Sequence, residues 1–103
     1  MLYIFEVHIK PGHSAEGYAD AWVRASRIIQ QAPGAQGTRL HRKIGDDNVL
    51  LAIARWRSKD ERDVMETHQP AQVREIIMSQ AEFVDVRFIG EFEEPEWVVE
   101  PPA

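Results

Sequence analysis

Cysteine is absent from this chain of 103 residues. Its absence excludes disulfide bonds, thiolate nucleophiles, iron–sulfur clusters and zinc sites built on cysteine. Long hydrophobic runs are missing as well. The apolar opening segment from Leu2 to Ile9 carries Glu6 and His8, and it is too short and too polar for a signal peptide or a membrane span. We therefore expect a cytoplasmic protein with no membrane partner.

Positive charge is also scarce, since 12 Lys and Arg residues face 17 Asp and Glu residues and the net charge is −5. An acidic chain binds nucleic acid only if its basic residues gather on one face. Basic residues do gather in the middle of the chain: Arg39, Arg42, Lys43, Arg55 and Arg57. The strands predicted there have no mid-strand aromatic on which RNA bases would stack. The sequence thus predicts no nucleic-acid partner, and these arginines are assigned to interface ion pairs or to an anionic group of a substrate.

Histidines are too few and too dispersed to predict a metal site. The chain has four of them: His8, His13, His41 and His68. None forms a helical pair spaced by four residues, so no metal is expected. His41 lies among basic residues of a predicted strand, and His68 stands beside Pro70 at a predicted helix break. Both are candidates for ligand contact, with hydrogen bonding within the fold as the alternative.

Turn-forming residues divide the chain into segments with clear periodicity. Residues 2–9 are rich in β-branched and aromatic side chains and end at a Lys-Pro-Gly turn, which is typical of a strand. After Ser14, a candidate N-cap, apolar residues recur every three or four positions as far as Ala32. This pattern predicts an amphipathic helix that Pro33-Gly34 ends. Residues 37–44 and 49–57 are predicted strands, joined by a hairpin turn over residues 45–48.

A second helical region is predicted from Lys59 to Gln80, capped by Ser58 and split near Thr67–Gln69 because Pro70 follows. Residues 82–92 are predicted to form the fourth strand. The order βαββαβ is that of a ferredoxin-like sandwich, an α+β fold with the helices on one face of an antiparallel sheet. Residues 1–94 form this predicted domain, and residues 95–103 form an acidic tail outside it.

The predicted sheet is apolar on both faces. In the first strand Tyr3 and Phe5 point to one side, while Leu2 and Ile4 point to the other, and the third strand repeats this pattern. The helices cover only one face, so a second copy of the chain is the simplest cover for the other. A homodimer is therefore predicted. The apolar residues 97–99 would be exposed without reason in a free tail, so the tail is predicted to dock on the neighbouring subunit.

Four segments carry a family resemblance: Phe5-Glu6-Val7-His8-Ile9-Lys10-Pro11-Gly12, Ala32-Pro33-Gly34, Leu40-His41-Arg42 and Ala54-Arg55-Trp56-Arg57-Ser58-Lys59. With them the chain resembles, over nearly its whole length, the antibiotic-biosynthesis-monooxygenase-like members of the dimeric α+β barrel superfamily. The resemblance implies two ferredoxin-like sheets paired into a barrel, with a pocket between sheet and helices in each subunit. It also implies oxidation of polyketide-like aromatic substrates by molecular oxygen without a cofactor, as in some members.

Two departures from the superfamily affect what the resemblance implies. Members often carry a glutamate two residues before the third-strand tryptophan, where this chain has Ala54. The haem-degrading branch relies on an asparagine in the first strand and on a tryptophan and a histidine in the second helical region. Here the only asparagine is Asn48, and Met65 and Glu75 occupy the other two positions. Because a carboxylate is a poor substitute for imidazole as a haem ligand, we expect no haem degradation.

The residues predicted to contact a small-molecule ligand are Tyr3, Phe5, Trp22, His41, Trp56 and His68. For Trp22, and for Tyr18 one turn before it, packing in the core is the alternative. The leading hypothesis is a cofactor-independent monooxygenase that binds a small aromatic or polyketide-like metabolite. A histidine or a water would deprotonate this substrate, so that the resulting anion reduces oxygen. The alternative is a non-catalytic dimeric module whose pocket holds a small apolar metabolite or completes the dimer core.

Overall fold

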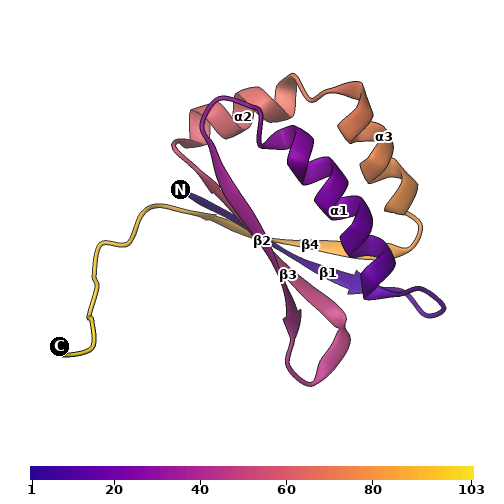
Figure 1. Ribbon diagram of the computed structural model, residues 1–103, viewed down its shortest axis with the longest axis horizontal. Helices are drawn as coiled ribbons and strands as arrows, with labels where there is room; N and C mark the ends of the chain where they lie inside the picture. Colours follow the sequence, from indigo (N-terminus) through magenta and orange to yellow (C-terminus); the bar gives the residue numbers. More distant parts are fainter.

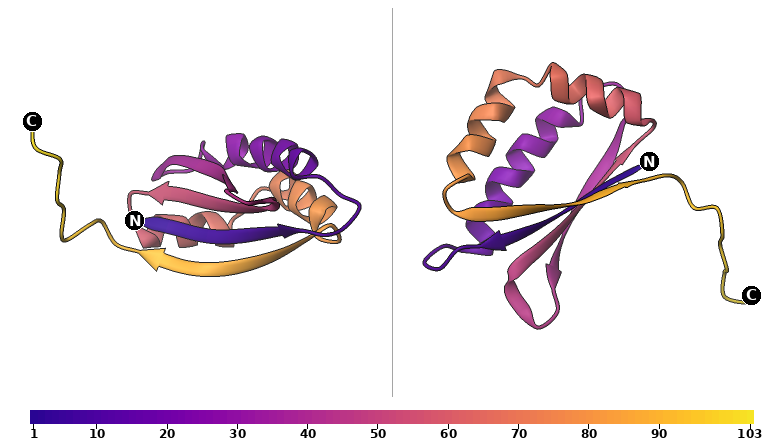
Figure 2. Two further views of the ribbon diagram at one scale, coloured as in Figure 1. Left: turned by 90° about the horizontal axis from the view of Figure 1, so that it is seen from below. Right: turned by 180° about the vertical axis from the view of Figure 1, so that it is seen from behind.

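Two layers make up the fold, and the computed structural model describes all of residues 1–103 (Figure 1). The elements in chain order are β1 (Leu2–Ile9), α1 (Ala15–Ile29), β2 (Ala35–Lys43), β3 (Asp46–Trp56), α2 (Lys59–Thr67), α3 (Ala71–Gln80) and β4 (Val84–Phe92). The strands form one sheet in the order β2-β3-β1-β4, and all neighbours are antiparallel. The helices all lie on one face of this sheet (Figure 2). The predicted ferredoxin-like βαββαβ fold is confirmed.

The hairpin between β2 and β3 is longer and tighter than predicted. Asp46 already pairs with Lys43, and at the other end Ala35 pairs with Trp56. Strand pairing is a backbone property, so it continues through residues whose side chains favour turns. In the predicted turn only Gly45 has a positive φ, of 88°, so Asp46 and the residues after it are free to extend as strand.

Both predicted helix caps are present. The Ser14 hydroxyl accepts a hydrogen bond from the Gly17 amide at 3.1 Å, and the Ser58 hydroxyl accepts one from the Glu61 amide at 3.2 Å. Each cap satisfies a backbone N–H that has no partner inside its helix. The Ser58 hydroxyl also donates to the Glu61 carboxylate at 3.0 Å. The side chain of Glu61, three residues after Ser58, is thus held against the start of α2.

Gly34, in the turn between α1 and β2, is required by its surroundings. Its φ is 87°, a conformation that is strained for residues with a side chain. A Cβ atom at this position would also lie 2.6 Å from the side chain of Glu61. The Gly34 carbonyl accepts a hydrogen bond from the Arg57 amide at 2.8 Å. The end of α1 and the start of α2 are therefore held together at this glycine.

Pro70 separates α2 from α3, and the joint covers residues 68–70, one residue later than predicted. The two helices run in different directions after this break (Figure 1). α3 packs against α1 and makes few contacts with the sheet. Space therefore remains between α3 and the edge of the sheet at β4.

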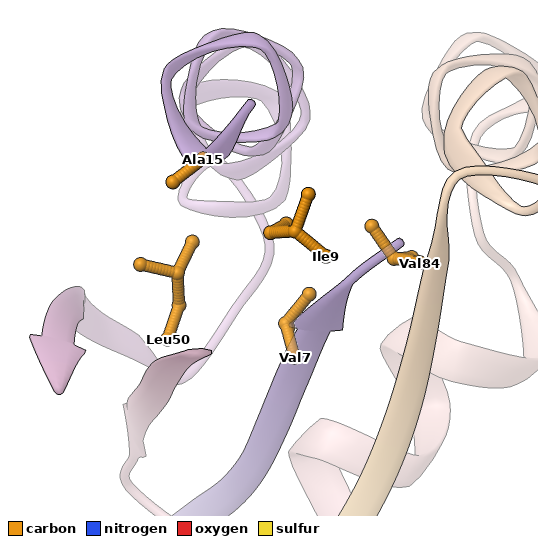
Figure 3. Packing of buried hydrophobic residues seen from close by; sticks show 5 residues of the cluster. All are labelled: Val7, Ile9, Ala15, Leu50 and Val84. Atoms are coloured by element: carbon orange, nitrogen blue, oxygen red, sulfur yellow. The ribbon is translucent and has the colours of Figure 1, made fainter. Parts of the chain in front are cut away.

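The hydrophobic core occupies one end of the space between the layers. Its buried members are Val7, Ile9, Ala15, Leu50 and Val84 (Figure 3). They come from the end of β1 and the beginnings of α1, β3 and β4, which meet at this end of the sheet. A cavity begins beside this core, at Phe5 and Val84, and extends toward Tyr3 and Trp56.

The face of the sheet without helices is partly apolar, as the alternation in β1 and β3 predicted. Ile4 pairs with Ile53, Glu6 with Leu51 and His8 with Val49 on this side. Beyond β4 the chain runs away from the body as an extended tail (Figure 1). Trp97 is 86% exposed and Val99 is 96% exposed in the single chain. No helix combines the length and the apolar character that crossing a bilayer requires.

Candidate functional site

A cavity of about 640 Å³ lies between the sheet and the helices, and 16 of its 23 lining residues are hydrophobic. All four strands contribute to its floor, β2 through Thr38 alone, and all three helices form its roof. The volume is within the range that small-molecule sites occupy in proteins, of about 300–1,000 Å³. The space is therefore sufficient for a ligand of several fused rings.

Small side chains and the direction of α3 create this space. Ala21 and Ala25 line the cavity from α1, and Ala54 lines it from β3 between its cross-strand neighbours Tyr3 and Thr38. A methyl group at these positions fills little of the gap between layers that pack about 10 Å apart. Ala54 thus contributes to the floor of the cavity and leaves it uncharged at this point.

Aromatic rings form one wall. The rings of Tyr3 and Phe88 lie 5.0 Å apart at an interplanar angle of 37°, and Tyr3 meets Phe5 edge to face at 6.1 Å. Phe88 is exposed at the edge of the sheet, so the wall extends from the interior to the mouth of the cavity. Flat, polarisable side chains of this kind favour stacking with planar aromatic ligands.

Arg62 contributes the positive charge in the cavity. Its guanidinium carbon lies 3.9 Å from the centroid of the Tyr3 ring, a cation–π contact. Its Nη2 donates to a carboxylate oxygen of Glu66 at 3.2 Å. The side chain of Arg62 is only 16% exposed, whereas that of Glu66 is 53% exposed. These two are the charged residues that line the cavity.

Tyr18 lines the cavity from α1, and burial raises the pKa of its phenol to about 12. Burial has this direction because it disfavours the charged phenolate. At neutral pH the hydroxyl therefore keeps its proton. It can donate a hydrogen bond to a ligand oxygen, but it cannot act as a general base.

Four of the six predicted ligand residues line the cavity together: Tyr3, Phe5, Trp22 and Trp56. His68 lines a separate hollow of about 400 Å³ between the end of α1 and α2, because α2 ends just before it. His41 pairs with Leu51 in the sheet, which places it on the open face opposite to the cavity. Ligand contact by these six residues stays a prediction.

The cavity lining contains no histidine, so no histidine is placed to act as the expected base there. His8 and Glu6 are within hydrogen-bonding distance, at 2.5 Å between Nε2 and Oε1, on the open face. His13 stacks on Phe83 at 4.2 Å beyond the end of β1. Their side chains act in packing and hydrogen bonding outside the cavity. No group of three or more His, Asp or Glu residues is placed to hold a metal ion.

Sequence reasoning missed Arg62, Glu66 and Phe88 and assigned Tyr18 first to packing. For Arg62 a signal was present. Met65 belongs to the apolar side of the second helical region, and Arg62 lies three residues before it, which puts both on one helical face. The charge of Arg62 made it look like a solvent-facing residue.

Comparison with known proteins agrees with this architecture. Residues 1–72 match the sequence profile of a family described as antibiotic biosynthesis monooxygenase. A similar solved structure is that of SnoaB, a cofactor-independent oxygenase from Streptomyces nogalater, with a TM-score of 0.79, 14% identity and 96% of each chain covered.

Two further structures have a provisional assignment as antibiotic biosynthesis monooxygenases. The one from Nitrosomonas europaea has a TM-score of 0.69 and 11% identity, and the match covers 85% of this chain and 86% of that one. The one from Bordetella bronchiseptica has a TM-score of 0.64 and 20% identity, with 89% and 96% covered. At these identities the likeness shows the fold alone. No curated protein sequence matches the chain significantly.

Proposed function

The chain belongs to the antibiotic biosynthesis monooxygenase family, and from this premise we propose that it is a cofactor-independent monooxygenase acting on a small aromatic or polyketide-like metabolite. The observation that carries the proposal is the aromatic-walled cavity of about 640 Å³ between sheet and helices. Its size and its flat apolar surfaces suit a planar ligand. SnoaB, which shares the fold, is a cofactor-independent oxygenase.

The reaction we propose needs only the substrate and molecular oxygen. A hydroxylated aromatic with an oxidisable ring CH₂ group loses a proton and becomes an electron-rich anion, which transfers electrons to oxygen. A carbon–oxygen bond forms at this carbon and the oxygen–oxygen bond breaks. One oxygen atom becomes the new carbonyl, and the other leaves as water with the two hydrogens of the CH₂ group. The substrate supplies all the electrons, so no cofactor is required.

The chain's own residues would position the substrate and control its protons. Trp22 and the aromatic wall would hold the ring, and the neutral Tyr18 would donate a hydrogen bond to a ligand oxygen. Since no histidine lines the cavity, the proton would leave through water at the mouth. The apolar lining would keep other water away from the oxygen-reactive anion.

A non-catalytic binding module is the second candidate, and one observation favours it. The cavity offers no histidine, and Tyr18 cannot serve as a base at neutral pH. In this case the same walls would hold an aromatic metabolite without changing it.

We place either function in a homodimer. The open face carries Ile4, Leu51 and Ile53 on neighbouring strands, and an apolar sheet face of this kind is normally covered. A second copy of the chain would cover it through the same face, by two-fold symmetry.

Oxygen uptake with 1,8-dihydroxyanthrone tests the catalytic proposal. We expect uptake above the rate without protein, and one atom of labelled oxygen in the product when ¹⁸O₂ is used. Ala54→Leu narrows the cavity floor and is expected to lower turnover about tenfold or more, in keeping with the sensitivity of catalysis to substrate position. Ala71→Leu adds the same group at an exposed site of α3 outside the cavity and is the control.

Two other outcomes are informative. Quenching of tryptophan fluorescence by the anthrone without any protein-dependent oxygen uptake would contradict the enzyme and support the binding module. Absence of both would contradict an aromatic-binding role of either kind.

A further inference from the structure

Most arginines of the central hairpin already have acidic partners. Arg42 Nη2 donates to Glu16 at 2.6 Å, Arg55 Nη2 donates to Glu94 at 2.9 Å, and Arg57 pairs with Glu61. These three pairs lie outside the cavity lining. Three of the arginines that the sequence offered for an anionic substrate group are thus engaged elsewhere, and Arg39 pairs with Ile53 on the open face. The cation that lines the cavity is Arg62.

We propose that Arg62 binds an anionic oxygen substituent on the ring of the ligand, so that the cavity selects aromatic acids or ionised hydroxyaromatics over neutral analogues. This inference rests on the proposed binding of an aromatic metabolite in the same cavity. It adds the charge of the ligand and the residue that recognises it.

The surroundings of Arg62 leave it able to take a further partner. Of its side-chain nitrogens only Nη2 donates a hydrogen bond within the chain, to Glu66. Nε, Nη1 and the second hydrogen of Nη2 remain for a ligand. Each edge of a guanidinium that binds a carboxylate through two parallel hydrogen bonds includes Nη2, so a ligand anion would take either one hydrogen bond from Nε or Nη1 or a pair that includes the second Nη2 hydrogen. The contact with the Tyr3 ring at 3.9 Å fixes the position of the guanidinium beside the aromatic wall.

Burial makes a ligand anion a stronger partner than Glu66. Glu66 meets Arg62 across one helical turn from a position that is 53% exposed, and exposed pairs of this kind hold weakly because water screens them. An anion inside the apolar cavity would face Arg62 with less screening. A planar ligand stacked near Tyr3 and Phe88 would present a substituent on its edge to the guanidinium.

This contact would also assist the proposed reaction. A positive charge beside an ionised hydroxyl favours the anion over the neutral form. The electron-rich species that reduces oxygen would therefore be more abundant in the cavity than in water. Arg62 would be a specificity-determining residue that contacts the substrate, rather than a base that removes its proton.

Equilibrium binding of a matched ligand pair tests the inference. The probes are 3-hydroxy-2-naphthoic acid and its methyl ester, measured by tryptophan fluorescence with the wild-type protein and with Arg62→Met. We expect the acid to bind the variant about 10- to 100-fold more weakly, the usual effect of losing a hydrogen-bonded charge. The ester should bind both proteins equally. Arg62→Lys keeps the charge and should keep part of the preference for the acid.

Arg24→Met is the matched control. Arg24 also pairs with an acid one helical turn away, Asp20 at 3.3 Å, on the exposed side of α1, so the control removes a comparable surface pair without touching the cavity. Equal affinity of wild type and Arg62→Met for the acid would overturn the inference and leave the cavity as an aromatic site. Equal losses for acid and ester would also overturn it, because Arg62 would then act only through packing. If neither probe binds the wild type, the proposed function itself fails.

Discussion

At the scale of one residue, the position of Tyr18 in the fold determines the protonation of its phenol. In the sequence it reads as one more aromatic on the apolar side of α1, and packing is its simplest role. In the fold it lines the cavity, and burial raises its pKa to about 12. The side chain is consequently a proton donor under all physiological conditions, which suits a contact with a ligand oxygen.

The pKa of Tyr18 predicts a loss of stability in alkali. The phenol titrates near pH 10 in the unfolded chain and at about 12 in the folded one. The folded state thus holds its proton more tightly, and this contribution to stability is complete below pH 10 and is lost as the pH rises from 10 to 12. A difference of two pKa units corresponds to about 2–3 kcal/mol.

Urea unfolding of wild type and Tyr18→Phe at pH 8 and pH 11.5 measures this contribution. The wild type should lose about 2 kcal/mol more than Tyr18→Phe between the two pH values. Equal losses would show that Tyr18 does not titrate differently in the folded state.

The candidate site could be predicted in part from the sequence. The positions of its aromatic residues were predictable, whereas those of the histidines were not. Tyr3, Phe5, Trp22 and Trp56 were found because alternation in strands and helical period both place large apolar side chains toward the covered face. The histidines could not be placed in this way. For His68 the outcome depends on the angle between α2 and α3, which no local pattern encodes.

At the scale of elements, local chemistry predicted where helices begin better than where strands do. Ser14 and Ser58 cap their helices as expected, because a cap involves only residues within one turn. The ends of β2 and β3 were set by pairing across the sheet, between Ala35 and Trp56 and between Lys43 and Asp46. The packing of α3 against α1, which leaves space for the cavity, is a tertiary contact, and no local sequence pattern predicted it.

The tail provides an element-scale prediction. Its start is fixed at Glu94, whose carboxylate binds the Met1 ammonium at 2.9 Å and Arg55 at 2.9 Å. These contacts, first the hydrogen bond from the Met1 ammonium and then the charge of Arg55, lower the pKa of Glu94. The exposed residues 97–99 follow, and we predict that they dock on a neighbouring subunit. We expect deletion of residues 95–103 to lower the melting temperature and weaken dimerisation, because covered apolar surface would be lost.

Deletion of residues 101–103 alone is the control, since it leaves the apolar segment intact, and it should have no effect. Thermal melts and light scattering of the three proteins provide the comparison. If the longer deletion behaves like the control, the tail does not dock.

At the scale of the whole molecule, the open sheet face predicts a dimer with an interface above about 2,000 Å² in total, as is usual for obligate pairs. Ile4→Asp places a charge in the middle of this face and should give monomeric or insoluble protein. Ile44→Asp introduces the same change in the hairpin turn, where the side chain is 99% exposed, and should remain dimeric. Light scattering at micromolar concentration decides the matter. A monomeric wild type would refute the prediction.

The two faces of β1 have a further consequence for how such proteins diversify. Tyr3 and Phe5 line the cavity, while Ile4, between them, points to the open face. A substitution at Tyr3 or Phe5 is therefore expected to alter ligand preference and to leave the surface proposed for assembly unchanged, and one at Ile4 is expected to do the reverse. Selection can act on the two properties separately, although the residues are neighbours in the chain. The residues that line the cavity can thus vary while the surface proposed for assembly stays the same.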